Sequence, residues 1–98
     1  MLSPVRNGTA PVFDATRAYR LDPDVAIRPE PSGALAYHYR NRRLTFLRAP
    51  ALVALVRELE HHDSVESALA VSPIAPGRWP AFRKALAALA ESEVIRAR

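Results

Sequence analysis

The pattern of hydrophobic and polar positions changes near the middle of the chain. From residue 18 to residue 47, apolar side chains tend to recur at every second position, which is the period of a β-strand. From Pro50 onward they recur at about every third or fourth position, which is the period of a helix. This order predicts an α+β fold, in which a three-stranded antiparallel sheet is followed by a three-helix bundle.

Turn-forming residues divide the first segment into strands. Ala18–Leu21 is expected to form a short strand or a turn, and the chain then bends at Asp22-Pro23-Asp24 because proline restricts its own φ and the residue before it. The strands of the predicted sheet are Val25–Glu30, Ala34–Arg40 and Leu44–Leu47.

The turn between the second and third strands decides which side chains share a face. A two-residue turn at Asn41-Arg42 would pair Tyr37 with Phe46 and gather the large apolar groups on one face. A three-residue turn would divide these groups between the two faces. Burial favours the first alternative, which directs Tyr37 and Tyr39 into the core and leaves His38 on the sheet surface.

Prolines and a capping pattern indicate where the predicted helices begin. Pro50 suits the first turn of a helix that ends near His61, with a buried stripe formed by Leu52, Leu55, Val56 and Leu59. Asp63 is the predicted cap of a short second helix through Ala70, with Glu66 reaching back to complete a capping box. The third helix is expected over Pro80–Glu91, with Phe82, Leu86 and Leu89 as its core stripe.

Composition narrows the class of protein. We expect a flexible N-terminal arm over residues 1–16 and one small domain over residues 17–98. The absence of cysteine excludes disulfides, thiol catalysis and cysteine-ligated zinc. No signal-peptide pattern is present, and no apolar run approaches the roughly 20 residues of a membrane span. We therefore expect a soluble, cytoplasmic protein.

Positive charge is concentrated in the first half of the chain. The net charge is +4, and residues 1–48 contain eight arginines but only four acidic residues. The second half is balanced, with six basic and six acidic residues. The excess favours an acidic partner for the first half, although a charged face that only promotes solubility explains it equally well.

The sequence contains no recognisable catalytic group. His38 has no carboxylate nearby in the sequence to orient it as a general base, and the glycines form no phosphate-binding loop. His61 and His62 are adjacent on a helix and point in different directions, so they do not share a metal ion. We expect no catalytic residues, no metal site and no cofactor, and hence no enzyme activity of the chain alone.

Two kinds of binding remain as alternatives. A winged-helix nucleic-acid-binding protein could use the cluster of Arg40, Arg42, Arg43 and Arg48 with Tyr37 and Tyr39. Against it, the hairpin precedes the helices, and the last helix offers only Arg83 and Lys84 to a nucleic acid. The strand Leu44–Leu47 comes last in the sheet, so its outer edge could bind an extended peptide, or it could simply be short and solvated.

Several segments carry a resemblance to a known family. They are Val25–Pro31, Gly33-Ala34-Leu35 before Tyr37-His38, Arg43-Leu44 before Phe46-Leu47, and Leu52–Leu59. With the order of strands and helices, they make residues 17–95 resemble the PqqD-like, winged-helix-like precursor-peptide recognition domains. Among these domains, the chain is most similar to the peptide chaperones of the mycofactocin system.

The resemblance implies a function and a site. Such domains bind the leader of a precursor peptide between the third strand and the third helix, and present it to a radical S-adenosylmethionine (radical SAM) maturase. In this chain the strand is Arg43–Leu47 (Arg43, Leu44, Thr45, Phe46 and Leu47), with contacts expected from the backbone of Arg43, Thr45 and Leu47. The implied helix residues are Arg78, Phe82, Ala85 and Leu89. As a hypothesis, docking of the maturase falls to Arg28, Glu30, His38 and Arg40.

Overall fold

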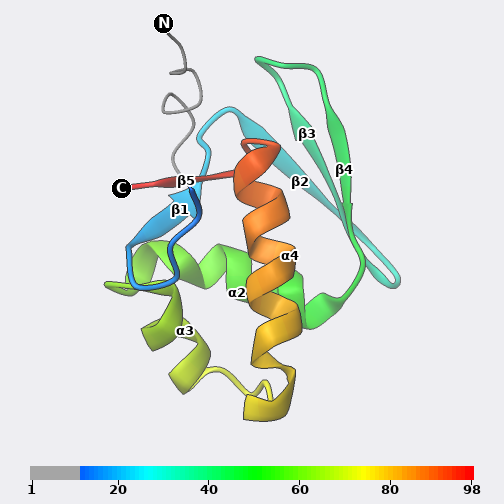
Figure 1. The fold of residues 1–98 in the computed structure, drawn as a ribbon. Coiled ribbons are helices and arrows are strands. Elements are labelled where there is room, and N and C mark those ends of the chain that lie inside the picture. The colour runs from blue at the N-terminus through cyan, green and yellow to red at the C-terminus, as the bar shows by residue number, and fades with distance from the viewer. Residues whose placement is uncertain (1–11) are drawn as a thin grey trace, which may run out of the picture.

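The structure is a computed structural model and describes residues 12–98. Its strands are β1 (Tyr19–Leu21), β2 (Val25–Glu30), β3 (Gly33–His38), β4 (Leu44–Leu47) and β5 (Ile95–Ala97). Its α-helices are α2 (Pro50–Glu58), α3 (Val65–Val71) and α4 (Trp79–Glu91), with short 3-10 turns at Leu59–His61 and Pro76–Arg78. The sheet lies on one side of the molecule and the helices on the other (Figure 1).

The mixed α+β architecture is confirmed. The main sheet is antiparallel and three-stranded in the order β2-β3-β4, and three α-helices follow it along the described chain. A further element was not predicted, because β5 pairs with β1 in a separate two-stranded sheet. This pairing joins Tyr19 to Ala97 and so brings the last strand beside the first.

The register between β3 and β4 differs from the predicted one by two residues. Tyr37 pairs with Leu44, whereas the two-residue turn would have paired it with Phe46. The hairpin loop is therefore longer than predicted, and the positive φ of 64° falls on Arg42. Because a shift of two residues keeps each side chain on its own face, the predicted grouping of side chains survives the error.

The orientation of that sheet was predicted wrongly. Ala34, Ala36 and Leu47 are buried in the core, and His38 is also inside, with 1% of its surface exposed. Tyr39, which was expected inside, is 62% exposed. The face with the large aromatic groups thus points to solvent, and the face with the small side chains packs on the helices.

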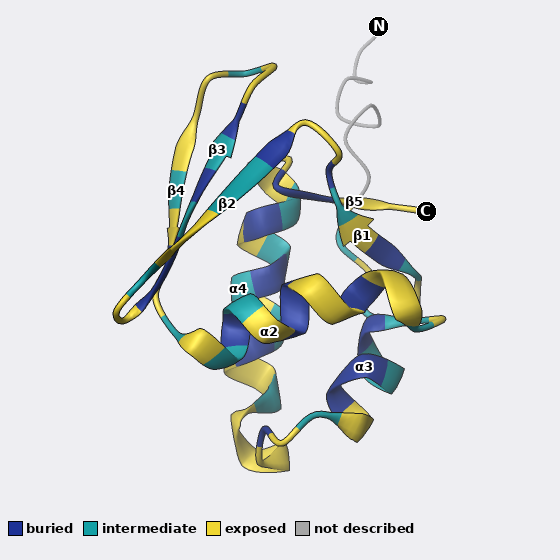
Figure 2. Ribbon diagram, turned by 180° about the vertical axis from the view of Figure 1, so that it is seen from behind, coloured by how far each residue is buried: buried dark blue, intermediate teal, exposed yellow. Residues whose placement is uncertain are grey.

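The helices supply most of the core. The apolar stripes of α2 and α4 are buried as predicted; they are Leu52, Leu55, Val56 and Leu59, and Phe82, Leu86 and Leu89. Buried residues of both helices face each other and the inner face of the sheet (Figure 2). None of the described helices has the length and hydrophobicity that crossing a bilayer requires.

The N-terminus of α3 is capped by a different residue from the predicted one. The hydroxyl of Ser64 accepts a hydrogen bond from the amide of Ser67, and the Ser67 hydroxyl accepts one from the Ser64 amide. This reciprocal pair replaces the predicted caps, Asp63 and Glu66. Glu66 is instead available for a contact with another helix.

The predicted N-terminal arm lies mostly outside the described residues. Within its described end, the ring of Phe13 lies 5.0 Å from that of Tyr19, and the amide of Glu66 donates to the carbonyl of Ala15. Residues 13 and 15 also pack against the core. The last residues of the predicted arm are therefore in contact with the domain.

Candidate functional site

The outer edge of β4 is open in the described part of the chain. This strand is last in the sheet order, with β3 on its only paired side. The amide of His38 donates to the carbonyl of Arg43, so these two residues form a hydrogen-bonded pair. In an antiparallel ladder such pairs alternate along the strand, which makes the pairs of Thr45 with Ala36 and of Leu47 with Ala34 hydrogen-bonded as well.

This alternation decides which backbone groups an added strand can reach. The backbone groups of Arg43, Thr45 and Leu47 are directed to β3, so the backbone hydrogen bonds predicted between them and a leader peptide do not fit this register. The amides and carbonyls of Leu44 and Phe46 point to the open edge instead. An extended peptide would therefore bind through the backbone of these two residues.

The predicted helix residues are unequally accessible. Phe82 and Leu89 are core residues, with 6% and 5% of their surface exposed. Ala85 is partly buried, whereas Arg78 is exposed and places its guanidinium over the Phe82 ring, 5.2 Å from the centroid. Of the predicted set on this helix, Arg78 and Ala85 are the side chains that a bound peptide could contact without displacing the core.

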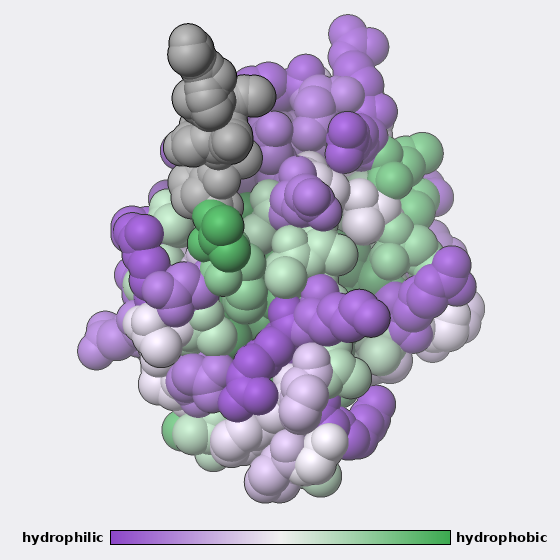
Figure 3. All heavy atoms as spheres, viewed as in Figure 1, coloured by the Kyte–Doolittle hydropathy of each residue, from purple (hydrophilic) through white to green (hydrophobic). Residues whose placement is uncertain are grey.

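The hairpin loop is fastened to the end of α4. The side-chain amide of Asn41 donates to the carbonyl of Ser92 at 3.4 Å, and Arg40 Nη1 lies 3.6 Å from Glu93 Oε1. Because of these contacts, β4 and α4 are both exposed on the side of the molecule that Figure 1 shows. On this side, hydrophobic and weakly polar residues alternate with strongly hydrophilic ones (Figure 3).

Asp22 is the centre of a polar network beneath the hairpin. Its side chain is buried, accepts a hydrogen bond from the Asp24 amide at 2.8 Å and accepts another from Arg40 Nη2 at 3.0 Å. Burial raises the pKa of Asp22, but the bonds from Asp24 and Arg40 outweigh it, so the net pKa lies below the usual value. Asp22 in turn raises the pKa of Arg40 through their hydrogen bond.

His38 belongs to the same network. Its Nδ1 accepts hydrogen bonds from the backbone amides of Arg40 at 3.2 Å and Asn41 at 3.4 Å. Its Nε2 lies 3.7 Å from Oδ2 of Asp22. This histidine holds the hairpin loop from inside, and the prediction that it lies on the sheet surface is wrong.

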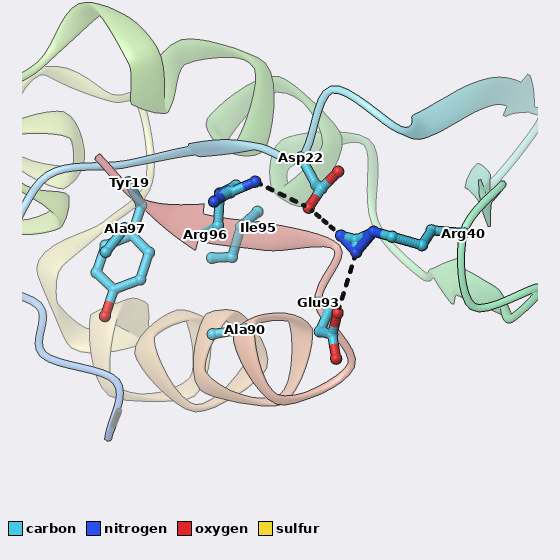
Figure 4. Close-up of a pocket in the computed structure, with 8 residues that line it drawn as sticks. All are labelled: Tyr19, Asp22, Arg40, Ala90, Glu93, Ile95, Arg96 and Ala97. Carbon is cyan, nitrogen blue, oxygen red and sulfur yellow. Dashed lines mark hydrogen bonds and ion pairs between the residues drawn. The ribbon is translucent and has the colours of Figure 1, made fainter. Parts of the chain in front are cut away.

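The network borders a cavity of about 470 Å³ between α4, β5 and the hairpin loop. Figure 4 shows Arg40 extending between Asp22 and Glu93, with Arg96 on the other side of Asp22. Each charged group in this view has an oppositely charged neighbour, at distances from 3.0 to 3.8 Å. The arrangement joins the hairpin to the end of α4 and to β5.

The remaining residues of the docking hypothesis lie on β2. Arg28 Nε donates to Glu30 Oε2 at 3.2 Å, and the Arg28 side chain is 73% exposed. Both residues are on the same sheet face as Leu35 and Phe46, because Arg28 pairs with Leu35, which pairs with Phe46. Arg28 and Glu30 are thus accessible to another protein, whereas His38 is not.

Comparison with known proteins places the chain in a family. Residues 18–96 match the model of the peptide chaperone MftB family. The chain belongs to this family. It is 40% identical over 86 residues to a peptide chaperone MftB from Mycobacterium ulcerans, a match that spans 88% of this chain and 79% of the relative. It is 36% identical over 90 residues to one from Mycobacterium tuberculosis, spanning 92% and 83% of the two chains.

A third MftB relative, from Mycolicibacterium smegmatis, is 37% identical over 83 residues and is spanned to 81% of its length. No solved structure matches the chain. The MftB match covers the described strands and helices from β1 to α4 and the first two residues of β5. The open edge of β4 and the network around Asp22 therefore lie within the matched part.

Sequence reasoning missed Asp22 as a structural residue. In the sequence it was interpreted as an acidic residue of the bend before β2, and its partner Arg40 lies 18 positions away. A buried carboxylate needs hydrogen-bond donors. Arg40, at the far end of the neighbouring hairpin, was the sequence feature that could have indicated one. That signal requires the β2–β3 pairing, which places His38 opposite Val25 and so brings Arg40 near Asp22.

Proposed function

We propose that this chain is the peptide chaperone of a mycofactocin biosynthetic system. It binds the leader of a precursor peptide and delivers the peptide to a radical SAM enzyme. The observation that carries the proposal is an open strand edge, at Leu44 and Phe46, in a chain of the MftB family. Curated relatives that carry the name peptide chaperone support the same role.

The proposed mechanism is strand addition. The leader would lie antiparallel or parallel to β4 and exchange backbone hydrogen bonds with Leu44 and Phe46. Side chains on one face of the added strand would then approach Ala85 of α4 and Arg78, which directly precedes this helix, as in the PqqD-like, winged-helix-like arrangement that we propose for this fold. Holding the leader extended raises the effective concentration of the reacting end at the enzyme.

Contact with the enzyme is proposed for the exposed part of the β2–β3 hairpin. Arg28 and Glu30 are accessible and would touch the enzyme directly. His38 and Arg40 would act by holding the hairpin in place, since His38 is buried and Arg40 is bound to Asp22. The chain itself supplies no catalytic group in this proposal, and its contribution is to position the peptide.

A titration with two ligands tests the proposal. The purified chain is titrated with the leader of its precursor peptide and, separately, with duplex DNA, each at low and at moderate salt. Saturable peptide binding that persists at moderate salt is the expected result. DNA binding that weakens steeply with salt, without any response to the peptide, would instead identify a nucleic-acid-binding protein and overturn the proposal.

The structure already reduces the case for DNA binding. Arg83, one of two cations that the last helix could offer to a nucleic acid, forms a two-pronged ion pair with Glu66 of α3. Its Nη2 donates to Glu66 Oε1 at 2.8 Å. Since this guanidinium is engaged within the protein, Lys84 is the cation that α4 still offers to a nucleic acid.

A further inference from the structure

The outer face of the main sheet is a continuous apolar surface. We call it the outer sheet face and define it by Leu35, Tyr37, Tyr39, Leu44 and Phe46. Leu35 pairs with Phe46 and Tyr37 pairs with Leu44, so these four side chains stand in two adjoining rows. Tyr39 extends the second row, with its ring 5.2 Å from that of Tyr37 in an edge-on arrangement.

No described element covers this surface. Leu44 is 63% exposed and Phe46 is 40% exposed, while the helices pack on the opposite face of the sheet (Figure 2). Of the five large hydrophobic residues exposed in the described part of the chain, three belong to the outer sheet face. Clustered aromatic groups of this kind mark a surface that another protein covers.

Charge at the border of the face selects the kind of partner. Arg28 of β2 pairs with Leu35 of β3. Arg48 holds its guanidinium over the Phe46 ring, 5.5 Å from the centroid. Two positive groups therefore flank the apolar residues. The acidic residues nearest to them are Glu30, which is bonded to Arg28, and Asp24, whose carbonyl accepts a hydrogen bond from the Tyr39 amide. A second copy of the chain would bring arginines against arginines, whereas a surface with an apolar centre and acidic groups around it would be complementary.

We propose that the outer sheet face is the docking surface for the radical SAM enzyme, with acidic side chains of the enzyme around an apolar contact. This inference rests on the proposed function and deepens it, because it names the surface and its chemistry. A leader added at β4 would lie along the border of the same face. The enzyme would then contact the chaperone and the bound peptide at the same surface. Docking of the chaperone would therefore bring the peptide to the enzyme.

Two substitutions away from β4 test the docking surface. Tyr39→Ser removes an exposed aromatic group, and Arg28→Glu reverses a bordering charge; neither residue belongs to the proposed leader site. Val71→Ser is the matched control, because Val71 is 70% exposed at the end of α3, far from the sheet. Circular dichroism and thermal unfolding establish that each variant is folded.

Binding of each variant to the purified radical SAM enzyme of the same system is measured by biolayer interferometry. Binding to a labelled leader is measured by fluorescence anisotropy. We expect the double variant, which combines Tyr39→Ser with Arg28→Glu, to bind the enzyme at least about tenfold more weakly, with leader affinity within about twofold of the wild type. Val71→Ser should change neither measurement.

The outcomes separate the docking surface from the proposed function. Unchanged enzyme binding in the folded double variant, or no enzyme binding by the wild type, would overturn the docking surface. A wild-type dimer in sedimentation that Tyr39→Ser dissociates would also overturn it, in favour of self-association. A wild type that does not bind the leader would overturn the proposed function, and the enzyme measurement would still decide the surface.

Discussion

Substitution of Phe46 by proline tests strand addition at one backbone group. The Phe46 amide points to the open edge of β4, because Phe46 and Leu35 form a pair that does not exchange hydrogen bonds. Proline removes this donor and places its ring at the edge where a peptide would approach. The bonds between β3 and β4 are retained, since they involve the neighbouring residues.

The magnitude follows from the single donor that is lost. A backbone hydrogen bond contributes a net free energy of about 0.5–1.5 kcal/mol, which corresponds to an affinity change of about 2- to 13-fold. The proline ring adds to this loss, because adjacent strands must approach to about 4.8 Å and the ring occupies part of that space. We therefore expect the leader affinity of Phe46→Pro to fall by at least about tenfold.

Phe46→Ala is the matched control, because it removes the aromatic side chain and keeps the amide. The affinity of both variants for a labelled leader is measured by fluorescence anisotropy, after circular dichroism shows that they are folded. If the two variants bind the leader equally well, strand addition at β4 is refuted. Thr45→Pro should behave differently, since it breaks a bond to β3 and lowers the midpoint of thermal unfolding.

Two further predictions concern stability. A Cβ atom on Gly33 would lie 1.8 Å from the carbonyl oxygen of Leu47. Gly33→Ala should therefore lower the free energy of unfolding by about 1–3 kcal/mol or more. Gly77→Ala, where a Cβ meets no atom within 4 Å, should change it by less than about 0.5 kcal/mol in urea unfolding; equal effects would contradict the packing. The folded-state pKa values of Asp22 and Glu66 lie below their usual range. Both groups therefore stabilise the fold when the pH is above their pKa in the unfolded chain, which is about 4. This stabilisation disappears as the pH falls through the folded-state pKa values. Thermal unfolding from neutral to acidic pH should show the loss, and Asp22→Asn should make it smaller; an unchanged pH profile would contradict the role of Asp22.

Local pattern was enough to predict most elements, because period and turn residues act over short distances. The strands at Val25–Glu30 and Leu44–Leu47 and the helix that begins at Pro50 are found where they were expected. β5 was missed because its three residues form a strand only by pairing with β1, more than 70 positions earlier.

The inverted sheet has a different physical origin. The prediction assumed that the larger apolar side chains of β3 would be buried, whereas the helices pack on Ala34 and Ala36, which are 0% and 1% exposed. Small side chains allow the helices to approach the sheet closely. His38 is accommodated on this face because two backbone amides donate to its Nδ1 and the Asp22 carboxylate lies 3.7 Å from its Nε2. The alternation of alanines was the signal for the inner face.

The same packing explains why the aromatic residues became a surface. Once small residues occupy the inner face of β3, the period of a strand requires Tyr37 and Tyr39 to point outward. Such exposure serves no purpose in stabilising an isolated domain, since a core gains from burying these rings. The network of Asp22, His38 and Arg40 holds the hairpin in this orientation at the cost of a buried charge. The proposed docking surface accounts for this arrangement, because a partner that covers the outer sheet face would bury these aromatic side chains.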